Sequence, residues 1–225
     1  MKSFTISANP PFLSRNIQAF YHTEFYGYGK PNNPDYLNIL KNDKHQNWSE
    51  AQLKFSYNKV ADIIGNDIGS ILEMQYGDEF EKISSGWSER KEFVVTVVPR
   101  AKKASEYKEN QLMFIDAVYW ALQPLDDLHL IDVIQCGEVI KRHTNTKTTH
   151  LRRPTEFAND GKLPYPGITK DTCFISDKIA GRDVILIDDI YTETVNIDED
   201  MIQALLDTGA KSVIFYAIGK TTHLI

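Results

Sequence analysis

The chain has 225 residues, 42% of them hydrophobic, which is enough to bury a substantial core. A formal net charge of −6 argues against a nonspecific nucleic-acid-binding protein, which usually presents a strongly basic face, although a local basic patch is compatible with it. No apolar run approaches the roughly 18–20 residues of a membrane-spanning helix, and the N-terminus lacks the apolar centre of a signal peptide, so we expect a soluble, cytoplasmic protein.

The first 90 residues contain an aromatic-rich segment followed by a helical one. Residues 1–35 are rich in Tyr, Phe, Pro and Asn, a composition that favours irregular structure or short strands. Their aromatic side chains indicate either a packed surface layer or dimer face, or a surface for base stacking. Residues 49–75 place apolar side chains near helical spacing behind Ser49, which can cap a helix. Gly65 and Gly69 could divide this stretch into two helices.

The rest of the chain alternates between strand and helix patterns. Phe93–Val98 predicts a strand that ends at Pro99, and Asn110–Leu122 predicts an amphipathic helix that ends at Pro124. The later elements are a short strand at Leu130–Ile134, a polar loop or hairpin insertion at residues 141–172, a strand at Val184–Ile187, a helix between a cap at Asn196 or Asp198 and a stop at Gly209, and a strand at Val213–Ile218. This order predicts a parallel α/β sheet.

The cysteines and histidines do not indicate a metal site. Cys136 and Cys173 have no Cys or His at ligand spacing, so we expect two reduced, partly buried thiols. His143 and His150 lie seven residues apart in the polar insertion, and we expect both to be solvated loop residues.

Two adjacent acids follow the strand at Val184–Ile187. Four apolar residues without alternation are typical of a strand buried on both faces, as in a parallel sheet. Asp188 and Asp189 then stand at its carboxyl end, where open α/β sheets bind their ligands. Such carboxylates can accept hydrogen bonds from vicinal sugar hydroxyls, contact Mg²⁺ through water and stabilise positive charge at an anomeric carbon. The alternative is an acid pair that only forms the turn.

The stretch from Val184 to Asn196 resembles the ribose-phosphate signature of type I phosphoribosyltransferases, in the ComF-like branch related to amidophosphoribosyltransferases. That signature is an apolar strand, two acids, two variable residues and Thr-Thr-Gly-x-Thr. Asp188, Asp189 and Thr192 match it, whereas Glu193, Thr194 and Asn196 replace its second Thr, its Gly and its last Thr. The resemblance covers about residues 90–222, with weaker matches at Asn110, Gln111, Arg142, Thr146 and Gly209–Ala217. It implies a phosphoribosyltransferase-like (Rossmann-like) parallel sheet flanked by helices, with an N-terminal cap and a long flexible loop.

The resemblance also implies roles for individual residues. Asp188 and Asp189 would be catalytic and hold the ribose. The 5′-phosphate would lie in the loop before the next helix, formed by Tyr191, Thr192, Glu193, Thr194, Val195 and Asn196. The diphosphate would contact Arg100, Lys102 and Lys103, which otherwise form a solvated basic turn, and Arg142 would belong to a loop that closes over the sugar. The implied cofactor is Mg²⁺, held through the diphosphate, with Asp188 and Asp189 as candidate contacts.

Three functions remain open. An enzyme would bind phosphoribosyl diphosphate with magnesium and transfer ribose phosphate to a nitrogen nucleophile. A catalytically degenerate protein of the same fold would bind a nucleotide and act as a regulator or effector subunit, for example in a bacterial defence or DNA-uptake system; Glu193 and Thr194 favour it. A nucleic-acid-handling accessory protein is less expected, because the chain is acidic.

The organisation into parts is a further expectation. We expect residues 1–90 to form an aromatic-rich cap with a helical segment, and residues 91–225 to form the phosphoribosyltransferase-like core. A homodimer or another protein partner is compatible with each of the three functions, and no contact with a membrane is expected.

Overall fold

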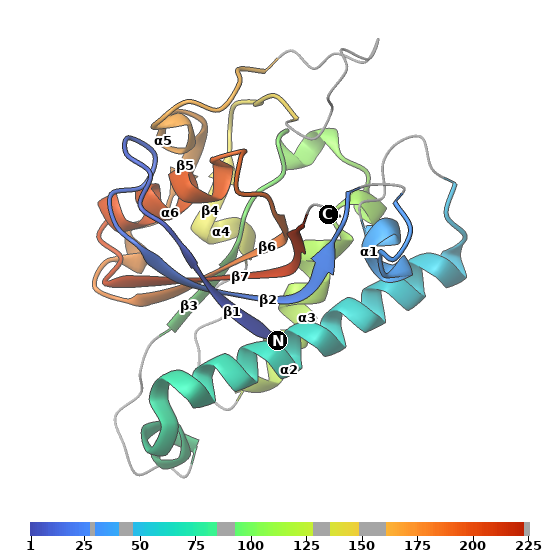
Figure 1. Ribbon diagram of the computed structural model, residues 1–225, viewed down its shortest axis with the longest axis horizontal. Helices are drawn as coiled ribbons and strands as arrows, with labels where there is room; N and C mark the ends of the chain where they lie inside the picture. Colours follow the sequence, from blue (N-terminus) through green and yellow to red (C-terminus); the bar gives the residue numbers. More distant parts are fainter. Residues whose placement is uncertain (28–29, 41–46, 85–92, 128–135, 149–160, 223–225) are drawn as a thin grey trace.

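A five-stranded sheet forms the centre of the molecule (Figure 1). The computed structural model describes residues 1–27, 30–40, 47–84, 93–127, 136–148 and 161–222. The strands lie in the order β1 (Lys2–Ile6), β2 (Ile17–Phe25), β7 (Ser212–Thr221), β6 (Asp183–Tyr191) and β3 (Phe93–Val97). β1 is antiparallel to β2, whereas the pairs β2–β7, β7–β6 and β6–β3 are parallel. The carboxyl ends of four strands therefore meet at one edge, and the predicted α/β fold with a mainly parallel sheet is confirmed.

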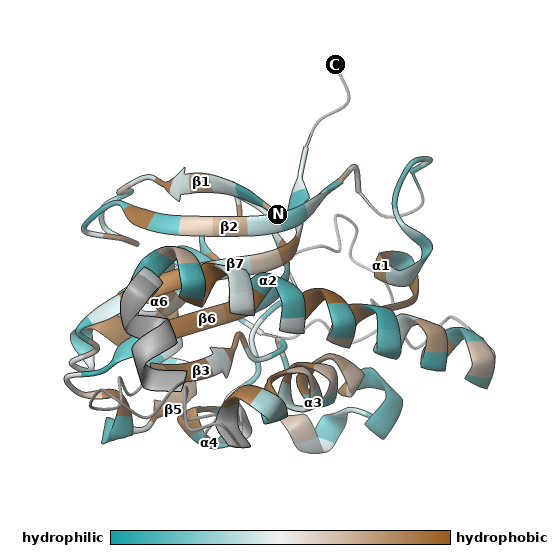
Figure 2. Ribbon diagram, turned by 90° about the horizontal axis from the view of Figure 1, so that it is seen from below, coloured by the Kyte–Doolittle hydropathy of each residue, from teal (hydrophilic) through white to brown (hydrophobic). Residues whose placement is uncertain are grey.

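The central strands are buried on both faces, as their apolar sequences predict. In β6, Ile185 and Ile187 join the core that α2 and α3 cover, whereas Val184 and Leu186 join the core that α6 covers. Figure 2 shows hydrophobic colour along β3 and β6. A strand with apolar neighbours on both sides needs no polar alternation, which is why a continuous apolar run forms it.

Helices α1 (Asp35–Leu40), α2 (Glu50–Ser84) and α3 (Met113–Asp127) cover one face of the sheet. The prediction that Gly65 and Gly69 divide the second helix is wrong, because α2 runs through both and its one non-helical residue is Gly77, with φ of 40°. A glycine inside a helix costs only about 1 kcal/mol relative to alanine, which packing against the sheet can outweigh. At Gly65 the absence of a side chain allows α2 to pack closely against α3, because a Cβ there would lie 3.3 Å from the Ala121 carbonyl oxygen.

The predicted bounds of the helix at Asn110–Leu122 need correction at both ends. A 3₁₀ turn, η2 (Glu109–Gln111), precedes α3, and α3 continues past Pro124 to Asp127. Proline removes one helical hydrogen bond, to the carbonyl four residues earlier, but it does not forbid the φ of a helix. That carbonyl belongs to Trp120, whose side chain is exposed, so the turn that loses the bond lies near water.

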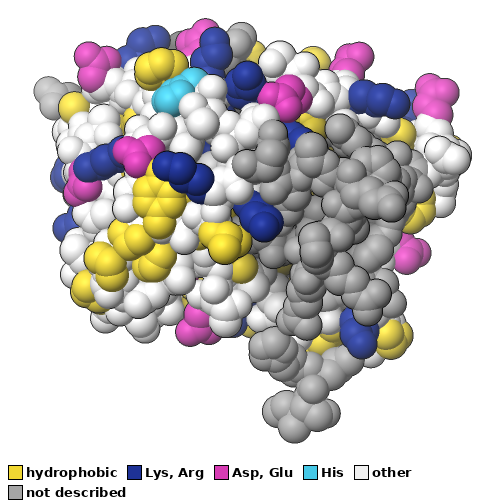
Figure 3. Space-filling view, turned by 90° about the horizontal axis from the view of Figure 1, so that it is seen from above, with side chains coloured by type: hydrophobic (Ala, Val, Ile, Leu, Met, Phe, Trp, Pro, Cys, Tyr) yellow, Lys and Arg dark blue, Asp and Glu magenta, His cyan; other side chains and the backbone are white. Residues whose placement is uncertain are grey.

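The other face of the sheet carries α6 (Ile197–Asp207), α4 (Cys136–Val139), α5 (Ile168–Thr172) and a second, two-stranded sheet. In that sheet β4 (Ile140–Arg142) pairs antiparallel with β5 (Cys173–Ile175), which agrees with a hairpin insertion between them. Figure 3 looks onto this side of the molecule and shows cationic and acidic side chains mixed on its surface. Two short 3₁₀ turns, η1 (Ala104–Glu106) and η3 (Asp177–Ile179), complete the described elements. The strand predicted at Leu130–Ile134 lies outside the described residues.

A polar network fastens α2 to the sheet. The Asp67 carboxylate accepts a hydrogen bond of 2.9 Å from the buried hydroxyl of Tyr216 and lies 2.9 Å from Nδ1 of His22. Burial raises the pKa of Asp67, but the hydrogen bonds from His22 and Tyr216 outweigh that effect, and the pKa is lowered overall. The network satisfies polar groups inside an otherwise apolar contact between helix and sheet.

The N-terminal residues belong to the main sheet. β1 and β2 lie within the aromatic-rich segment, and β2, with nine residues, pairs directly with β7. One continuous hydrophobic cluster joins Phe20, Leu37 and Ile64 with Val95 and Ile187, on either side of residue 90. The division at residue 90 therefore stays a prediction, while the two parts share one sheet and one core. Among the described residues, no helix is both long and apolar enough to cross a membrane.

Candidate functional site at the carboxyl edge of the sheet

The carboxyl edge of the sheet is stepped, because β6 and β7 extend beyond β3. The last hydrogen bond between β3 and β6 runs from the Val98 N–H to the Ile187 carbonyl, at 2.9 Å. Asp188 therefore stands where β3 departs, while β6 still pairs with β7 as far as Tyr191 and Lys220. A step between parallel strands at their carboxyl ends is the usual place for a ligand in open α/β sheets.

The alternation of side chains along β6 changes at the acid pair. The Asp189 N–H donates a hydrogen bond of 2.8 Å to Oδ1 of Asp188. Before the acid pair, odd-numbered residues of β6 face α2 and even-numbered residues face α6. After it, Ile190 joins the core under α2 and Tyr191 joins the core under α6, so the two faces are exchanged. Asp188 and Asp189 are both partly exposed, and both make interactions with neighbouring groups. The acid pair thus marks a local irregularity in the strand at its open edge.

A third carboxyl group, Asp198, lies buried beneath the pair at the start of α6. Its side chain shares a hydrogen bond with Asp188, whereas its Oδ1 is buried and has no hydrogen-bond partner among the described residues. Burial raises the pKa of Asp198 well above its usual value, and the charges of Asp188 and Glu199 add to the shift. Two carboxyl groups in such contact avoid carrying two negative charges by sharing a proton. The sequence indicates Asp198 only as an acid at a helix start, because nothing in the neighbouring residues distinguishes a buried acid there from an exposed one.

Glu199 and Tyr191 form a second buried polar contact. The Tyr191 hydroxyl donates a hydrogen bond of 2.8 Å to Oε1 of Glu199, and burial raises the pKa of both groups. The ring of Tyr191 packs between Phe4 and Phe215, with centroids 5.2 and 5.5 Å away. Tyr191 is therefore a core residue whose side chain anchors the loop, so any ligand contact that it makes would come from its backbone.

The loop after β6 is held at both ends. The hydroxyl of Thr192 lies 2.8 Å from that of Thr221, and the Val195 N–H closes a turn onto the Thr192 carbonyl at 3.1 Å. Glu193 and Thr194 are exposed at the tip. In this loop the residue with positive φ is Asn196, at 59°, so Thr194 does not need the backbone freedom of the glycine found in the resembling signature.

The start of α6 is partly occupied by the protein's own groups. Asn196 precedes the helix as predicted, but its side chain makes no capping hydrogen bond and instead accepts one of 2.8 Å from the Asn9 amide. The Glu199 carboxylate accepts a hydrogen bond from its own backbone N–H. Asp198, Glu199 and Asp200 place three acids in the first turn, which suits the helix dipole but leaves fewer free donors for a phosphate.

The basic segment after β3 has partners within the chain. Nη1 of Arg100 donates a hydrogen bond of 2.5 Å to the Gln111 carbonyl, and its guanidinium lies 4.7 Å from the centre of the Tyr107 ring. Lys102 is half-buried and its backbone N–H donates to the Tyr107 hydroxyl at 3.1 Å. Nζ of Lys103 lies 3.7 Å from Glu106 in an exposed ion pair. A ligand at this segment would compete with neutral partners at Arg100 and with one carboxylate at Lys103.

Arg142 is buried and ties the insertion to the basic segment. Its Nε donates a hydrogen bond of 2.7 Å to the Arg100 carbonyl, and its Nη1 donates one of 2.8 Å to the Thr172 hydroxyl. Burial lowers its pKa, so the contacts with oxygen atoms help to keep the charged form. Arg142, which was predicted to belong to a loop that closes over the sugar, instead has its side chain enclosed by Arg100 and Thr172, which are distant in sequence.

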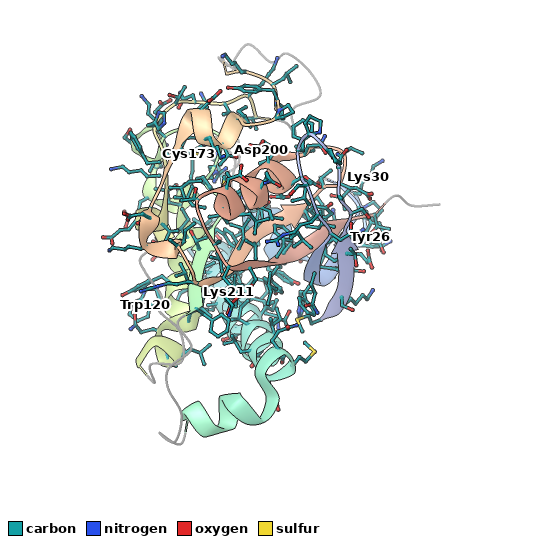
Figure 4. The ribbon with its side chains drawn as sticks, turned by 90° about the vertical axis from the view of Figure 1, so that its left-hand side faces the viewer. Tyr26, Lys30, Trp120, Cys173, Asp200 and Lys211 are labelled. Carbon is teal, nitrogen blue, oxygen red and sulfur yellow. The ribbon has the colours of Figure 1, made fainter. Side chains whose placement is uncertain are left out.

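Two further contacts fix the insertion beside the site. The Thr146 N–H donates a hydrogen bond of 2.7 Å to the Ala101 carbonyl, and a Cβ at Gly161 would lie 2.1 Å from the Thr146 carbonyl carbon. Asp200 accepts hydrogen bonds from the N–H groups of Gly167 and Thr169, at 2.5 and 2.8 Å. Figure 4 labels Asp200 and Cys173, on α6 and β5, where the insertion packs against the main body.

The donor set offers no complete metal centre by itself. Among the described residues, no three His, Cys, Asp or Glu side chains gather in a way that could hold a metal ion. Asp188 and Asp189 supply two partly exposed carboxylates. Mg²⁺ is often held by one or two carboxylates, with water and substrate phosphates as its other ligands, and the acid pair fits that arrangement.

Comparisons with known proteins add no family to this description. No protein-family model matches the chain, and no curated protein and no solved structure matches it either.

Proposed function

We propose that the carboxyl edge of the sheet binds phosphoribosyl diphosphate with magnesium, and that the protein transfers ribose phosphate from it to a nitrogen nucleophile, as in the phosphoribosyltransferases that its sequence resembles. One observation carries the proposal. The partly exposed pair Asp188 and Asp189 stands at the step between β3 and β6, and the basic segment at Arg100 begins two residues after the last hydrogen bond between these strands.

The chemistry of the ligand fits this arrangement. Carboxylates at the end of β6 can accept hydrogen bonds from the vicinal hydroxyls of a ribose, and the segment from Arg100 to Lys103 can offer cations to a diphosphate. In the transfer, a nitrogen lone pair forms a bond to the anomeric carbon while the carbon–oxygen bond to the diphosphate breaks. Asp188 and Asp189 would stabilise the positive charge that develops on the sugar. Magnesium, when bound, would neutralise the leaving diphosphate.

A binding role without turnover is the second candidate, and the loop after β6 favours it. Glu193, exposed at the tip, brings a negative charge to the loop in which a 5′-phosphate would lie. Repulsion between a carboxylate and a dianion weakens binding in both the ground state and the transition state. A nucleotide-binding regulator or effector subunit, with a protein partner or a second copy of the chain, would tolerate this loss better than an enzyme.

Calorimetric titration of phosphoribosyl diphosphate, with and without Mg²⁺, tests the proposal. We expect magnesium-dependent binding by the wild type and a loss of at least about tenfold in affinity for Asp188→Asn/Asp189→Asn, since each charged hydrogen bond contributes about 1.5–3 kcal/mol. Asp183→Asn is the matched control, because Asp183 lies at the other end of the same strand and pairs with Lys211 and Ser212. Equal affinity of the double variant and the control would refute a ribose site at the acid pair.

Release of diphosphate distinguishes the two candidates. Wild-type protein that binds the donor and releases diphosphate in the presence of an amine or a nucleobase is a transferase. Binding of the same donor without release in a panel of such acceptors supports the regulator. Glu193→Thr adds a direct check, because it removes the repelling charge from the exposed tip, and we expect it to strengthen donor binding.

A further inference from the structure

The outward face of the two-stranded sheet carries a compact group of exposed side chains. Along β4 and β5 the buried residues Ile140, Arg142 and Cys173 point into the molecule. Lys141 and Phe174 alternate with these residues and point outward, and strand pairing places them directly opposite each other. His143 follows β4 on the same outward side and is exposed. This surface, defined by Lys141, His143 and Phe174, lies on the opposite side of β4 from Arg142 and the proposed ribose site.

Two aromatic rings meet in a tilted contact on this surface. The Phe174 side chain is 66% exposed, the most exposed large hydrophobic side chain among the described residues. Its ring centre lies 4.4 Å from that of His143, with an interplanar angle of 45°. Nδ1 of His143 lies 2.9 Å from the Thr144 hydroxyl, a contact that orients the imidazole. A pair of oriented rings that leaves so much apolar area in water offers a platform on which another flat ring can stack.

The stretch of sequence that carries this platform differs in the sign of its net charge from the rest of the chain. Residues 136–182 contain nine Lys and Arg against five Asp and Glu, a net charge of +4. Since the whole chain has a net charge of −6, the remaining residues carry −10. Among the described residues, Lys141 forms no ion pair that would neutralise it before a ligand arrives. Figure 3 shows on this side a histidine beside a hydrophobic side chain, with Lys and Arg side chains and also Asp and Glu side chains close by.

We propose that this surface binds single-stranded nucleic acid, with a base stacked on the exposed ring of Phe174, beside His143, and the neighbouring phosphate on Lys141. Exposed aromatic rings with adjacent cations are the combination by which proteins hold unpaired strands, because every base has a ring face and every nucleotide a negative charge. A duplex hides its base faces in its own stack, so the platform favours single strands. The net positive charge of residues 136–182, with Lys141 on the surface itself, is what would let a chain that is acidic as a whole bind a polyanion here.

Fluorescence anisotropy with a labelled 15-nucleotide oligothymidine tests this proposal, with full-length protein at 50 and 200 mM salt. We expect binding that weakens at the higher salt, and a loss of about tenfold or more in affinity for Phe174→Ala. Phe55→Ala is the matched control, because Phe55 is also an exposed phenylalanine, 53% exposed, but lies on α2. Both substitutions trim exposed side chains, so both variants should fold, which circular dichroism verifies.

The outcomes separate this proposal from others. No binding by the wild type at 50 mM salt, or equal affinities of Phe174→Ala and Phe55→Ala, would overturn it. Binding to a duplex of the same length as tight as to the single strand would also overturn it, since stacking would then play no part. Lys141→Met should reduce affinity and the salt dependence together. Titration of phosphoribosyl diphosphate into Phe174→Ala distinguishes this surface from the proposed ribose site. The variant should bind phosphoribosyl diphosphate with the affinity of the wild type, even where its affinity for the oligonucleotide is reduced.

Discussion

At the scale of single residues, Asp198 shows how a buried acid depends on its surroundings. The carboxyl group is enclosed between β6 and α6 and shares a hydrogen bond with Asp188. Burial, followed by the charges of Asp188 and Glu199, raises its pKa in the folded state. The folded protein therefore binds a proton that the unfolded chain releases. Stability from this group is fully present below the ordinary pKa of an aspartate and is lost as the pH rises through the raised value.

Asp198→Asn tests this linkage. Asparagine has nearly the same shape, can donate a hydrogen bond to Asp188 and cannot ionise, so the variant should lose less stability between pH 5 and pH 9 than the wild type. Each pKa unit of the shift corresponds to about 1.4 kcal/mol in the free energy of unfolding. Urea denaturation of both proteins across this range measures the difference. Parallel pH curves would mean that Asp198 is not protonated in the folded protein, and Asp183→Asn controls for the loss of any one acid.

At the scale of elements, α2 shows that glycines are poor markers of a helix end. The helix continues through Gly65 and Gly69 and departs from helical geometry only at Gly77. The two earlier glycines differ in their surroundings, since a Cβ at Gly69 would meet no atom within 4 Å, whereas one at Gly65 would meet the Ala121 carbonyl. Packing against α3 therefore explains the glycine at position 65 but not the one at position 69.

The pair of substitutions Gly69→Ala and Gly65→Ala separates intrinsic helix preference from packing. Alanine lowers the conformational entropy of the unfolded chain and favours the helix, so Gly69→Ala should stabilise the protein by about 0.5–1 kcal/mol. At position 65 the same gain is offset by a contact of 3.3 Å with a backbone atom, so a smaller gain or a net loss is expected. Urea denaturation of both variants provides the comparison, and a larger gain at position 65 would contradict the packing of α2 against α3.

At the scale of the whole molecule, the N-terminal strands and helices are part of the main body. β2 pairs with β7 along its length, and one hydrophobic cluster includes residues from β2, α1, α2, β3, α3, β6 and β7. Removing residues 1–90 would leave an edge of β7 unpaired and expose much of one face of the sheet, because only α3 of its three covering helices would remain. A core that loses one of its covering layers cannot offset the entropy of ordering the chain.

We therefore expect a fragment of residues 91–225 not to fold by itself. Urea denaturation followed by circular dichroism should give a sigmoidal transition for the full chain and a shallow, non-cooperative change for the fragment. The chemical-shift dispersion of the fragment's amide NMR spectrum gives an independent measure. A sharp transition with well-dispersed amides would instead support the predicted division at residue 90, with the first part acting as a removable cap.

The parts of the fold that could be predicted are those with a strong local pattern. Phe93–Val97, Val184–Ile187 and Val213–Ile218 are apolar runs, and each lies in a central or covered strand of the sheet. β2 was not clearly predicted, because its sequence mixes aromatic and polar residues. It forms a strand by pairing with β7, nearly 200 residues later in the chain. Pro124 gave a clear but wrong prediction of a helix end, because α3 continues through it to Asp127.

The sequence by itself determined that acids follow a buried strand, and hence that Asp188 and Asp189 lie at the carboxyl edge of a parallel sheet. Only the tertiary structure decided what surrounds them. It enclosed Asp198 beneath Asp188, turned Arg142 inward to the Arg100 carbonyl and left Phe174 in water. The physical reason is that an apolar run buries itself wherever the chain folds, whereas the environment of a charged or exposed side chain is made by segments distant in sequence.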